Sequence, residues 1–206
     1  MNTDAARTRI LDAAEELFYA QGVQTVGMDS VRTTAGVTLR RLYQLFPSKD
    51  DLVEAYLERR DRRWLGELAD HVDAAAGTPA ERVLAVYDWL ADWFARPGFR
   101  GCAFVNSYGE LGATAPGVAA AARRHKEALR DYLTGLADDA GGPAGTGVRL
   151  ALLAEGAITL ATLTRTPAPA TEAREVARLL LANAGANTAA DAAADAAAAA
   201  STGVTA

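Results

Sequence analysis

A short basic segment between residues 30 and 49 carries the side chains best suited to contact a phosphate backbone. It holds four cations, Arg32, Arg40, Arg41 and Lys49, and no acidic residue, whereas the net charge of the 206-residue chain is −5. A basic end on an acidic body turns that end toward nucleic acid. Lys49 also lies near an expected helix start, where a cation opposes the helix dipole unless an anion such as phosphate is bound there. The sequence therefore predicts a nucleic-acid interface in this segment.

The residues around these cations have the turn and helix signals of a helix-turn-helix. Gly36 can adopt the positive φ that ends a helix, and Thr38 can accept a bond from the first free N–H groups of the next helix. Leu42, Leu45 and Phe46 recur at helical spacing and give that second helix a buried face. The opposite face is left for a ligand, so the second helix is predicted to meet DNA.

This segment resembles the DNA-binding region of the tetracycline-repressor (TetR/AcrR) family of bacterial transcription regulators. The residues that carry the resemblance are Ala35-Gly36-Val37-Thr38, then Leu42-Tyr43, Phe46-Pro47-Ser48-Lys49 and Asp51-Leu52. With the first helix, the resemblance covers about the first third of the chain. It implies a regulator that binds double-stranded DNA as a homodimer and responds to a small-molecule inducer.

The resemblance also implies which residues touch DNA. The side-chain chemistry agrees, because hydroxyl, phenol and ammonium groups donate to phosphates, while Arg and Gln pair with guanine and adenine edges. Arg41 could serve either role. The implied phosphate contacts are Thr38, Tyr43 and Lys49, and the implied base contacts are Leu39, Arg40 and Gln44.

Two residues depart from the family's pattern. Gly27 stands where Ser or Thr usually caps the second helix, so that cap and its phosphate contact should be weaker. Arg32 stands where a small residue usually lets the second and third helices cross. Its side chain must extend out past the crossing, or the two helices must separate slightly.

The remaining apolar residues recur at helical spacing and predict an all-α protein. An N-terminal three-helix helix-turn-helix DNA-binding domain is expected at residues 1–50, a helical ligand-binding and dimerisation domain at 51–184, and an Ala-rich, disordered tail at 185–206. Residues 1–6 are expected to be loose. Helices are expected from about residue 8 to 21 and over residues 28–35, 48–68, 80–95, 116–136, 148–164 and 171–184, with a short one beginning near 101–106.

Charged residues at 58–63 alternate in sign, which favours a solvent-exposed helix face formed by Arg59, Arg60, Arg62 and Arg63. Farther along, the helix from Val148 to Thr164 is apolar on nearly every side, and residues 171–184 form an amphipathic helix. The simplest way to bury both is to pack them against the same pair in a second subunit, which the resemblance also implies.

Half of the fourteen aromatic residues lie between residues 87 and 108. These rings could be packing alone, or they could line a pocket for a mostly apolar small molecule. The inducer cavity that the resemblance implies favours the pocket. His125 lies on an apolar helix face, where a histidine is more often a hydrogen-bonded core residue than a ligand contact. The expected pocket residues are Trp89, Trp93, Phe104, Asn106, Tyr108 and His125.

Other features narrow the class of protein. The single cysteine, Cys102, excludes an internal disulfide, and no signal-peptide pattern opens the chain, so a cytoplasmic location is expected. The longest apolar run contains Arg149 and Glu155 and falls short of the ~20 residues that span a bilayer, so no membrane span is expected. No metal or cofactor motif is recognised.

The function that these features favour is a ligand-responsive repressor that binds a palindromic operator as a homodimer. Two alternatives are a helical regulator that responds to a protein partner and an enzyme on a helical scaffold. The enzyme is disfavoured because Cys102 and the two histidines show no spacing that pairs a nucleophile with a base.

Overall fold

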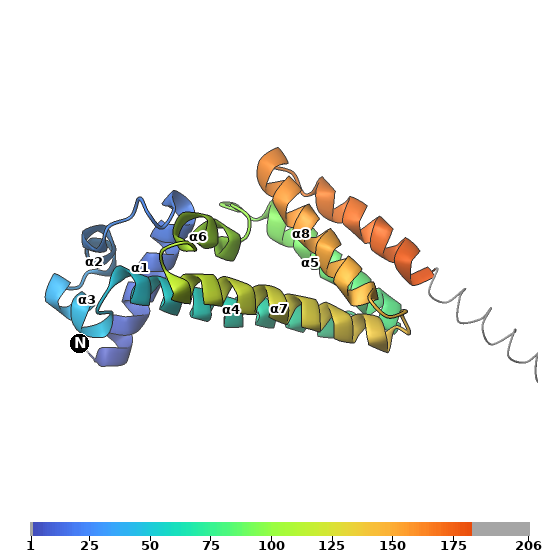
Figure 1. Ribbon diagram of the computed structural model, residues 1–206, viewed down its shortest axis with the longest axis horizontal. Coiled ribbons are helices and arrows are strands. Elements are labelled where there is room, and N and C mark those ends of the chain that lie inside the picture. Colours follow the sequence, from blue (N-terminus) through green and yellow to red (C-terminus); the bar gives the residue numbers. More distant parts are fainter. Residues whose placement is uncertain (1, 183–206) are drawn as a thin grey trace, which may run out of the picture. The chain divides into compact units, whose positions relative to one another are not determined.

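The computed structural model describes residues 2–182, and within them the chain is helical and contains no strand (Figure 1), which confirms the predicted all-α class. The predicted tail at 185–206 lies outside the described residues. A last helical segment covers residues 168–182. The preceding helices are α1 (Thr3–Gln21), α2 (Met28–Ala35), α3 (Leu39–Leu45), α4 (Lys49–Ala74), α5 (Pro79–Ala95), α6 (Ala103–Leu111), α7 (Pro116–Asp139) and α8 (Thr146–Thr164).

The chain divides into two compact units. The first unit contains Met1–Ala69 and Ala95–Leu129, and the second contains Asp70–Phe94 and the chain from Arg130 onward. The first unit therefore combines α1 to α3 with most of α4, with α6 and with the first half of α7. The predicted boundary after residue 50 falls inside this unit, because the N-terminal helices share their core with α4.

The N-terminal helix is longer than the sequence predicted. It begins at Thr3 rather than near Thr8, so the expectation that residues 1–6 are loose was wrong for residues 3–6. Asn2 caps the helix by accepting from the Asp4 N–H at 3.3 Å, and Ala6 is fully buried. The cap and the buried alanine stabilise this first turn, although it contains no large apolar residue from which the sequence pattern could have predicted it.

The solvent-exposed face that the alternating charges of α4 favoured is only partly present, because Arg62 and Arg63 are exposed but Arg59 and Arg60 are not. Arg59 and Arg60 donate to the Glu15 carboxylate of α1 at 2.9 and 3.0 Å, and Arg63 pairs with the same carboxylate. Arg60 is 8% exposed and lies over the Tyr19 ring at 4.1 Å. These pairs attach α1 to α4 inside the first unit, so alternating charges along one helix did not reveal the partner helix.

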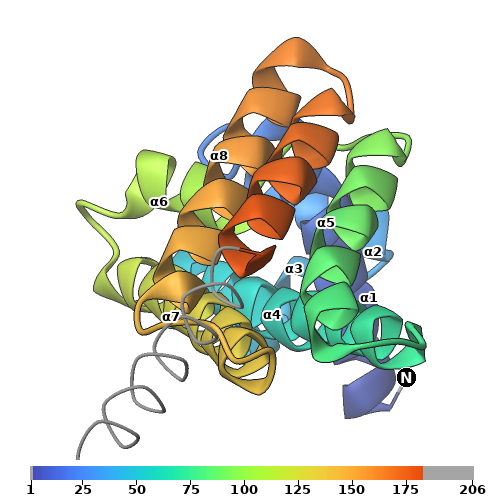
Figure 2. The ribbon, with the colours of Figure 1, turned by 90° about the vertical axis from the view of Figure 1, so that its right-hand side faces the viewer.

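The second unit contains α5, α8 and the helical segment 168–182, and the last two lie side by side (Figure 2). The Tyr87 hydroxyl donates to the backbone oxygen of Leu150 at 2.9 Å, which ties α5 to α8. Arg174 pairs with Asp88 at 2.8 Å, which ties the last segment to α5.

One described helix, α8, is long and apolar enough to span a membrane by length and composition alone, and 39% of its apolar window is buried. A core or interface helix of a soluble protein passes the same test, so this single helix is weak evidence for a membrane span.

Candidate nucleic-acid interface

The turn between α2 and α3 favours glycine because of its backbone conformation. Gly36 adopts the left-handed conformation, with φ 61° and ψ 42°, and the Val37 N–H closes the helix end by donating to the Arg32 oxygen at 3.0 Å. A Cβ atom at Gly36 would also meet the Arg9 guanidinium, the end of a flexible side chain that would have to move. The turn predicted from the sequence is therefore present, and it sets the direction in which α3 leaves α2.

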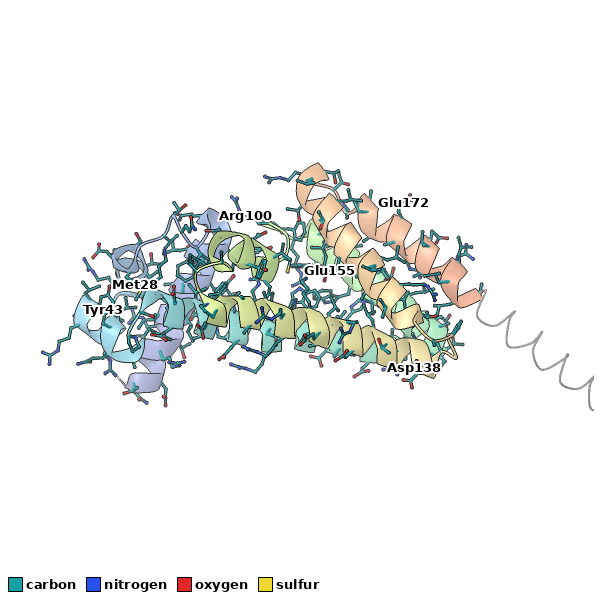
Figure 3. The ribbon with its side chains drawn as sticks, in the orientation of Figure 1. Met28, Tyr43, Arg100, Asp138, Glu155 and Glu172 are labelled. Carbon is teal, nitrogen blue, oxygen red and sulfur yellow. The ribbon has the colours of Figure 1, made fainter. Side chains whose placement is uncertain are left out.

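The apolar face of α3 is buried and its other face is open. Leu42 is fully buried and Phe46, just past the helix end, is 2% exposed, with the Arg7 guanidinium 4.6 Å above its ring. Leu39 and Tyr43 are 41% and 45% exposed, and both lie on the helix face opposite this packing. Figure 3 labels Tyr43 on α3, at the edge of the first unit in that view. Arg40 and Gln44, the other expected base contacts, are also exposed.

Thr38 is the N-cap of α3, as the sequence predicted. Its hydroxyl oxygen accepts from the Arg41 N–H at 3.2 Å, and its own hydrogen stays available for a second bond. Arg41 is half-buried because its guanidinium donates to Thr3 Oγ1 at 2.9 Å and to Gln44 Oε1 at 3.5 Å. This arginine therefore ties α3 to the start of α1.

Lys49 begins α4, and its ammonium donates to the backbone oxygen of Gln24 at 3.3 Å. Ser48 and Asp51 cap this helix start for each other, since the Ser48 N–H donates to Asp51 at 2.9 Å and the Asp51 N–H donates to Ser48 at 3.1 Å. Asp50 and Asp51 complement the helix dipole in the first turn. The side chain of Lys49 leaves that turn toward the segment between α1 and α2.

The two departures from the family's pattern have local consequences. Gly27 is the N-cap of α2, and no side-chain bond caps the helix there. Arg32 extends along α2 to pair with Asp29 at 2.7 Å, and its side chain is 38% exposed. The arginine thus points out of the crossing between α2 and α3, which is one of the two arrangements that the sequence allowed.

The six expected pocket residues do not form one group in either unit. Trp89 and Trp93 are buried in the second unit and stack at 5.7 Å between ring centroids. Asn106 and Tyr108, in the first unit, are exposed, and the Asn106 amide donates to the Arg100 oxygen at 3.0 Å. Arg100 is labelled beside α6 in Figure 3.

The remaining two expected pocket residues, Phe104 and His125, stack at 3.7 Å with an interplanar angle of 9°, and both are buried in the first unit. His125 is 2% exposed, and its Nδ1 lies 2.7 Å from Asp61 Oδ1. Burial opposes the charged imidazole, but the bonds to Asp61 and Cys102 together outweigh it, so the pKa of His125 is raised. This is the environment of a hydrogen-bonded core histidine.

The structure brings Cys102, the N-cap of α6, next to His125 in the middle of α7, a pairing that the sequence did not reveal because the two residues come from different helices. Lys126 Nζ is 3.2 Å from Cys102 Sγ. Burial raises the pKa of the thiol, but the bond to His125 and the Lys126 charge outweigh it and bring the pKa to about 7. Within residues 2–182, no group of three or more His, Cys, Asp and Glu side chains could hold a metal ion.

An apolar groove of about 440 Å³ lies in the second unit, between α8 and the chain from residue 166 to 176. Leu152 and Leu160 line it from α8, and Val176 lines it from the last segment. These three side chains are 69%, 53% and 42% exposed. The predicted dimerisation helices thus present the large apolar side chains that the single chain leaves uncovered.

Comparison with known proteins places this arrangement in a family. The family model described as bacterial regulatory proteins, tetR family, matches residues 10–56, which run from α1 into α4. An uncharacterized HTH-type transcriptional regulator of Mycobacterium tuberculosis is 39% identical over 82 residues, covering 40% of this chain and 40% of that protein. The HTH-type transcriptional activator FasR of Mycolicibacterium smegmatis is 33% identical over 133 residues, covering 62% of this chain and 57% of that protein.

The likeness in structure extends over nearly the whole chain. A TetR-family transcriptional regulator from Streptomyces coelicolor superposes with a TM-score of 0.78 and 31% sequence identity, covering 88% of this chain and 96% of that one. The family consists of regulators, so the enzyme alternative is rejected. The chain belongs to the TetR family of bacterial transcriptional regulators.

Proposed function

We propose that this regulator is a cytoplasmic homodimer that binds a palindromic DNA operator through α3 and changes its affinity for that operator when a small, mostly apolar molecule binds. The observation that carries the DNA-binding part is the exposed face of α3. That helix buries Leu42 while it leaves Leu39 and Tyr43 open, so its outer face is free to enter a major groove.

The side chains on that face divide by chemistry. Arg40 can bond guanine, Gln44 can bond adenine, and Leu39 can contact a thymine methyl group. Phosphate contacts are assigned to the Thr38 hydroxyl and the Lys49 ammonium, together with Tyr43. Arg41 has an internal partner in Thr3, so its proposed role is to hold α3 and to bind a phosphate with the remaining donors of its guanidinium.

The dimer part of the proposal rests on α8 and residues 168–182. Leu163 of α8 and Leu179 of the last segment are 76% and 53% exposed, in addition to the side chains that line the groove. Exposed apolar side chains in this number favour an interface. The same pair of helices from a second copy would cover them by forming a four-helix bundle.

The experiment that tests this proposal is selection of bound duplexes from a random DNA library by the purified full-length protein. The expected product is a palindrome whose half-sites lie about 34–36 Å apart, or a multiple of that distance. Failure to bind any double-stranded DNA at low ionic strength would overturn the proposal.

Ligand response is proposed for the buried layer around Phe104 and His125, because α6 packs there on α7, and α7 contacts α4, the helix that begins at Lys49. A molecule entering this layer can alter DNA binding only through different affinities for the two protein states. Titrating a panel of apolar aromatic compounds into the protein with and without operator DNA measures that difference, and equal affinities in both titrations for all compounds that bind would contradict the proposal.

Binding of the dimer is expected to reduce transcription, because a dimer bound at a promoter excludes RNA polymerase. The relative FasR is named an activator, so a reporter gene behind the selected operator tests the sign. Reporter expression should fall when the regulator is present, and a rise would reassign it as an activator.

A further inference from the structure

A chain of contacts in the first unit runs from α6 to the segment between α1 and α2 and ends at Lys49. The backbone N–H of Gln24 donates to the Glu110 carboxylate at 2.6 Å, and the Gln24 side-chain amide donates to the Glu110 backbone oxygen at 2.5 Å. The Gln24 carbonyl then accepts from Lys49 Nζ at 3.3 Å. Gln24 is therefore held by α6 on one side and holds Lys49 on the other.

The close approach of Glu110 to this segment is helped by the lack of a side chain at Gly22. Gly22 ends α1 with φ 88°, and a Cβ atom at that position would lie 3.1 Å from Glu110 Oε1. Glycine leaves the room that the carboxylate needs to reach the Gln24 N–H. A bond to an ionised acceptor is stronger than one between neutral groups, so Glu110 fixes the position of residue 24.

Fixing Gln24 also restrains Lys49. An ammonium has three donors, so one can hold the Gln24 oxygen while the others face a phosphate. A long side chain that must instead be immobilised at the moment of binding weakens the affinity by about 2- to 12-fold. The contact with Gln24 removes part of that loss before DNA arrives.

We propose that Glu110 is a positioning residue for DNA binding, which acts through Gln24 to hold the Lys49 ammonium where a phosphate will meet it. This inference rests on the proposed role of Lys49 as a phosphate contact. It also gives α6 a direct connection to the DNA-binding helices, because a shift of α6 would move Glu110 and release both Gln24 and Lys49.

The test compares Glu110→Ala with Glu110→Gln in the full-length protein, by fluorescence anisotropy on duplex DNA over a range of salt concentrations. Glu110→Ala should weaken binding by about 2- to 12-fold. It should also lower the salt slope toward that of Lys49→Ala, by at most about one. Glu110→Gln keeps an acceptor for the Gln24 N–H, so its affinity should stay close to that of the unchanged protein.

Charge alone predicts the opposite result. Removing a carboxylate near DNA would strengthen binding equally in Glu110→Ala and Glu110→Gln, and the same gain is expected of Glu16→Ala, which removes an exposed carboxylate from α1. A loss confined to Glu110→Ala therefore separates positioning from charge. Glu110→Met, which keeps the side-chain length without an acceptor, is the second variant if the alanine variant unfolds.

A double-mutant cycle completes the test. In a Lys49→Ala background, Glu110→Ala should cause no further loss, because the residue that it positions is gone. Additive losses, or unchanged affinity and salt slope in both Glu110→Ala and Glu110→Met, would overturn the inference. Failure of the proposed function would give a different result, because the unchanged protein itself would then not bind duplex DNA.

Discussion

At the scale of single residues, the roles proposed for Arg40 and Lys49 allow the contribution of base contacts to be separated from that of phosphate contacts. Arg40 lies on the exposed face of α3, and Lys49 lies at the start of α4 with its ammonium on Gln24. A side chain that bonds a base edge discriminates among sequences, whereas one that bonds a phosphate raises the affinity for all of them.

Arg40→Ala should relax the preference at one base position at a cost of about 1–3 kcal/mol. Lys49→Ala should weaken binding to all sequences alike and lower the salt slope by about one. Sequencing the bound fraction of a random library, together with affinities at several salt concentrations, measures both effects. An equal loss on operator and random DNA for Arg40→Ala would contradict its assignment to a base.

The sequence predicts the parts of the site that depend on contacts between neighbouring residues better than the parts that depend on contacts between distant segments. Gly36 and Thr38 act on neighbouring backbone atoms, so residue type and spacing sufficed to predict the turn and its cap. Lys49 was expected to face a phosphate, but its bond to Gln24 depends on how the end of α1 meets the start of α4. The pairing of Cys102 with His125 joins residues from different helices and was missed for the same reason.

At the scale of helices, backbone conformation should decide whether replacing a glycine with alanine raises or lowers the free energy of unfolding. Gly36 has φ 61° and faces the Arg9 guanidinium, whereas Gly135 lies inside α7 with no neighbouring atom within 4 Å of a Cβ. Gly36→Ala should lower the free energy of unfolding by about 1–2 kcal/mol, because the left-handed conformation strains a residue with a Cβ. Gly135→Ala should raise it by about 0.5–1 kcal/mol.

Urea denaturation followed by circular dichroism measures both changes, and each variant serves as the control for the other. Equal shifts in the same direction would contradict the assignment of special backbone geometry to Gly36.

Helix existence was predicted well because apolar spacing is a local signal, as for α2, which spans Met28–Ala35 as predicted. Arg59 and Arg60 were misjudged because their partner, Glu15, lies on another helix.

At the scale of the whole molecule, the net charge and the charge of the DNA-binding segment have opposite signs. The chain carries −5 overall, yet four cations and no anion lie between residues 30 and 49. An acidic body should limit nonspecific binding to DNA, while the local basic segment is the one proposed to contact phosphates. Two such segments in one dimer would bind with a high effective concentration for the second half-site.

The proposed dimer makes operator binding depend on α8. Leu152 and Leu160 line the groove on that helix, and covering their exposed parts with a second subunit should contribute about 1–2 kcal/mol per leucine. Because each substitution occurs twice in a dimer, Leu160→Glu should weaken dimerisation by roughly 100-fold or more. Sedimentation should then report monomers, and operator affinity should fall toward that of a single half-site, although α3 is unchanged.

Val105→Glu is the matched control, since Val105 is 51% exposed but belongs to α6 in the first unit and not to the proposed interface helices. It should leave the sedimentation coefficient and the operator footprint unchanged. If Leu160→Glu sedimented like the unchanged protein, the groove would have to be covered by something other than a second copy. If it became monomeric yet kept full operator affinity, dimerisation through α8 would not be what links the two DNA-binding segments.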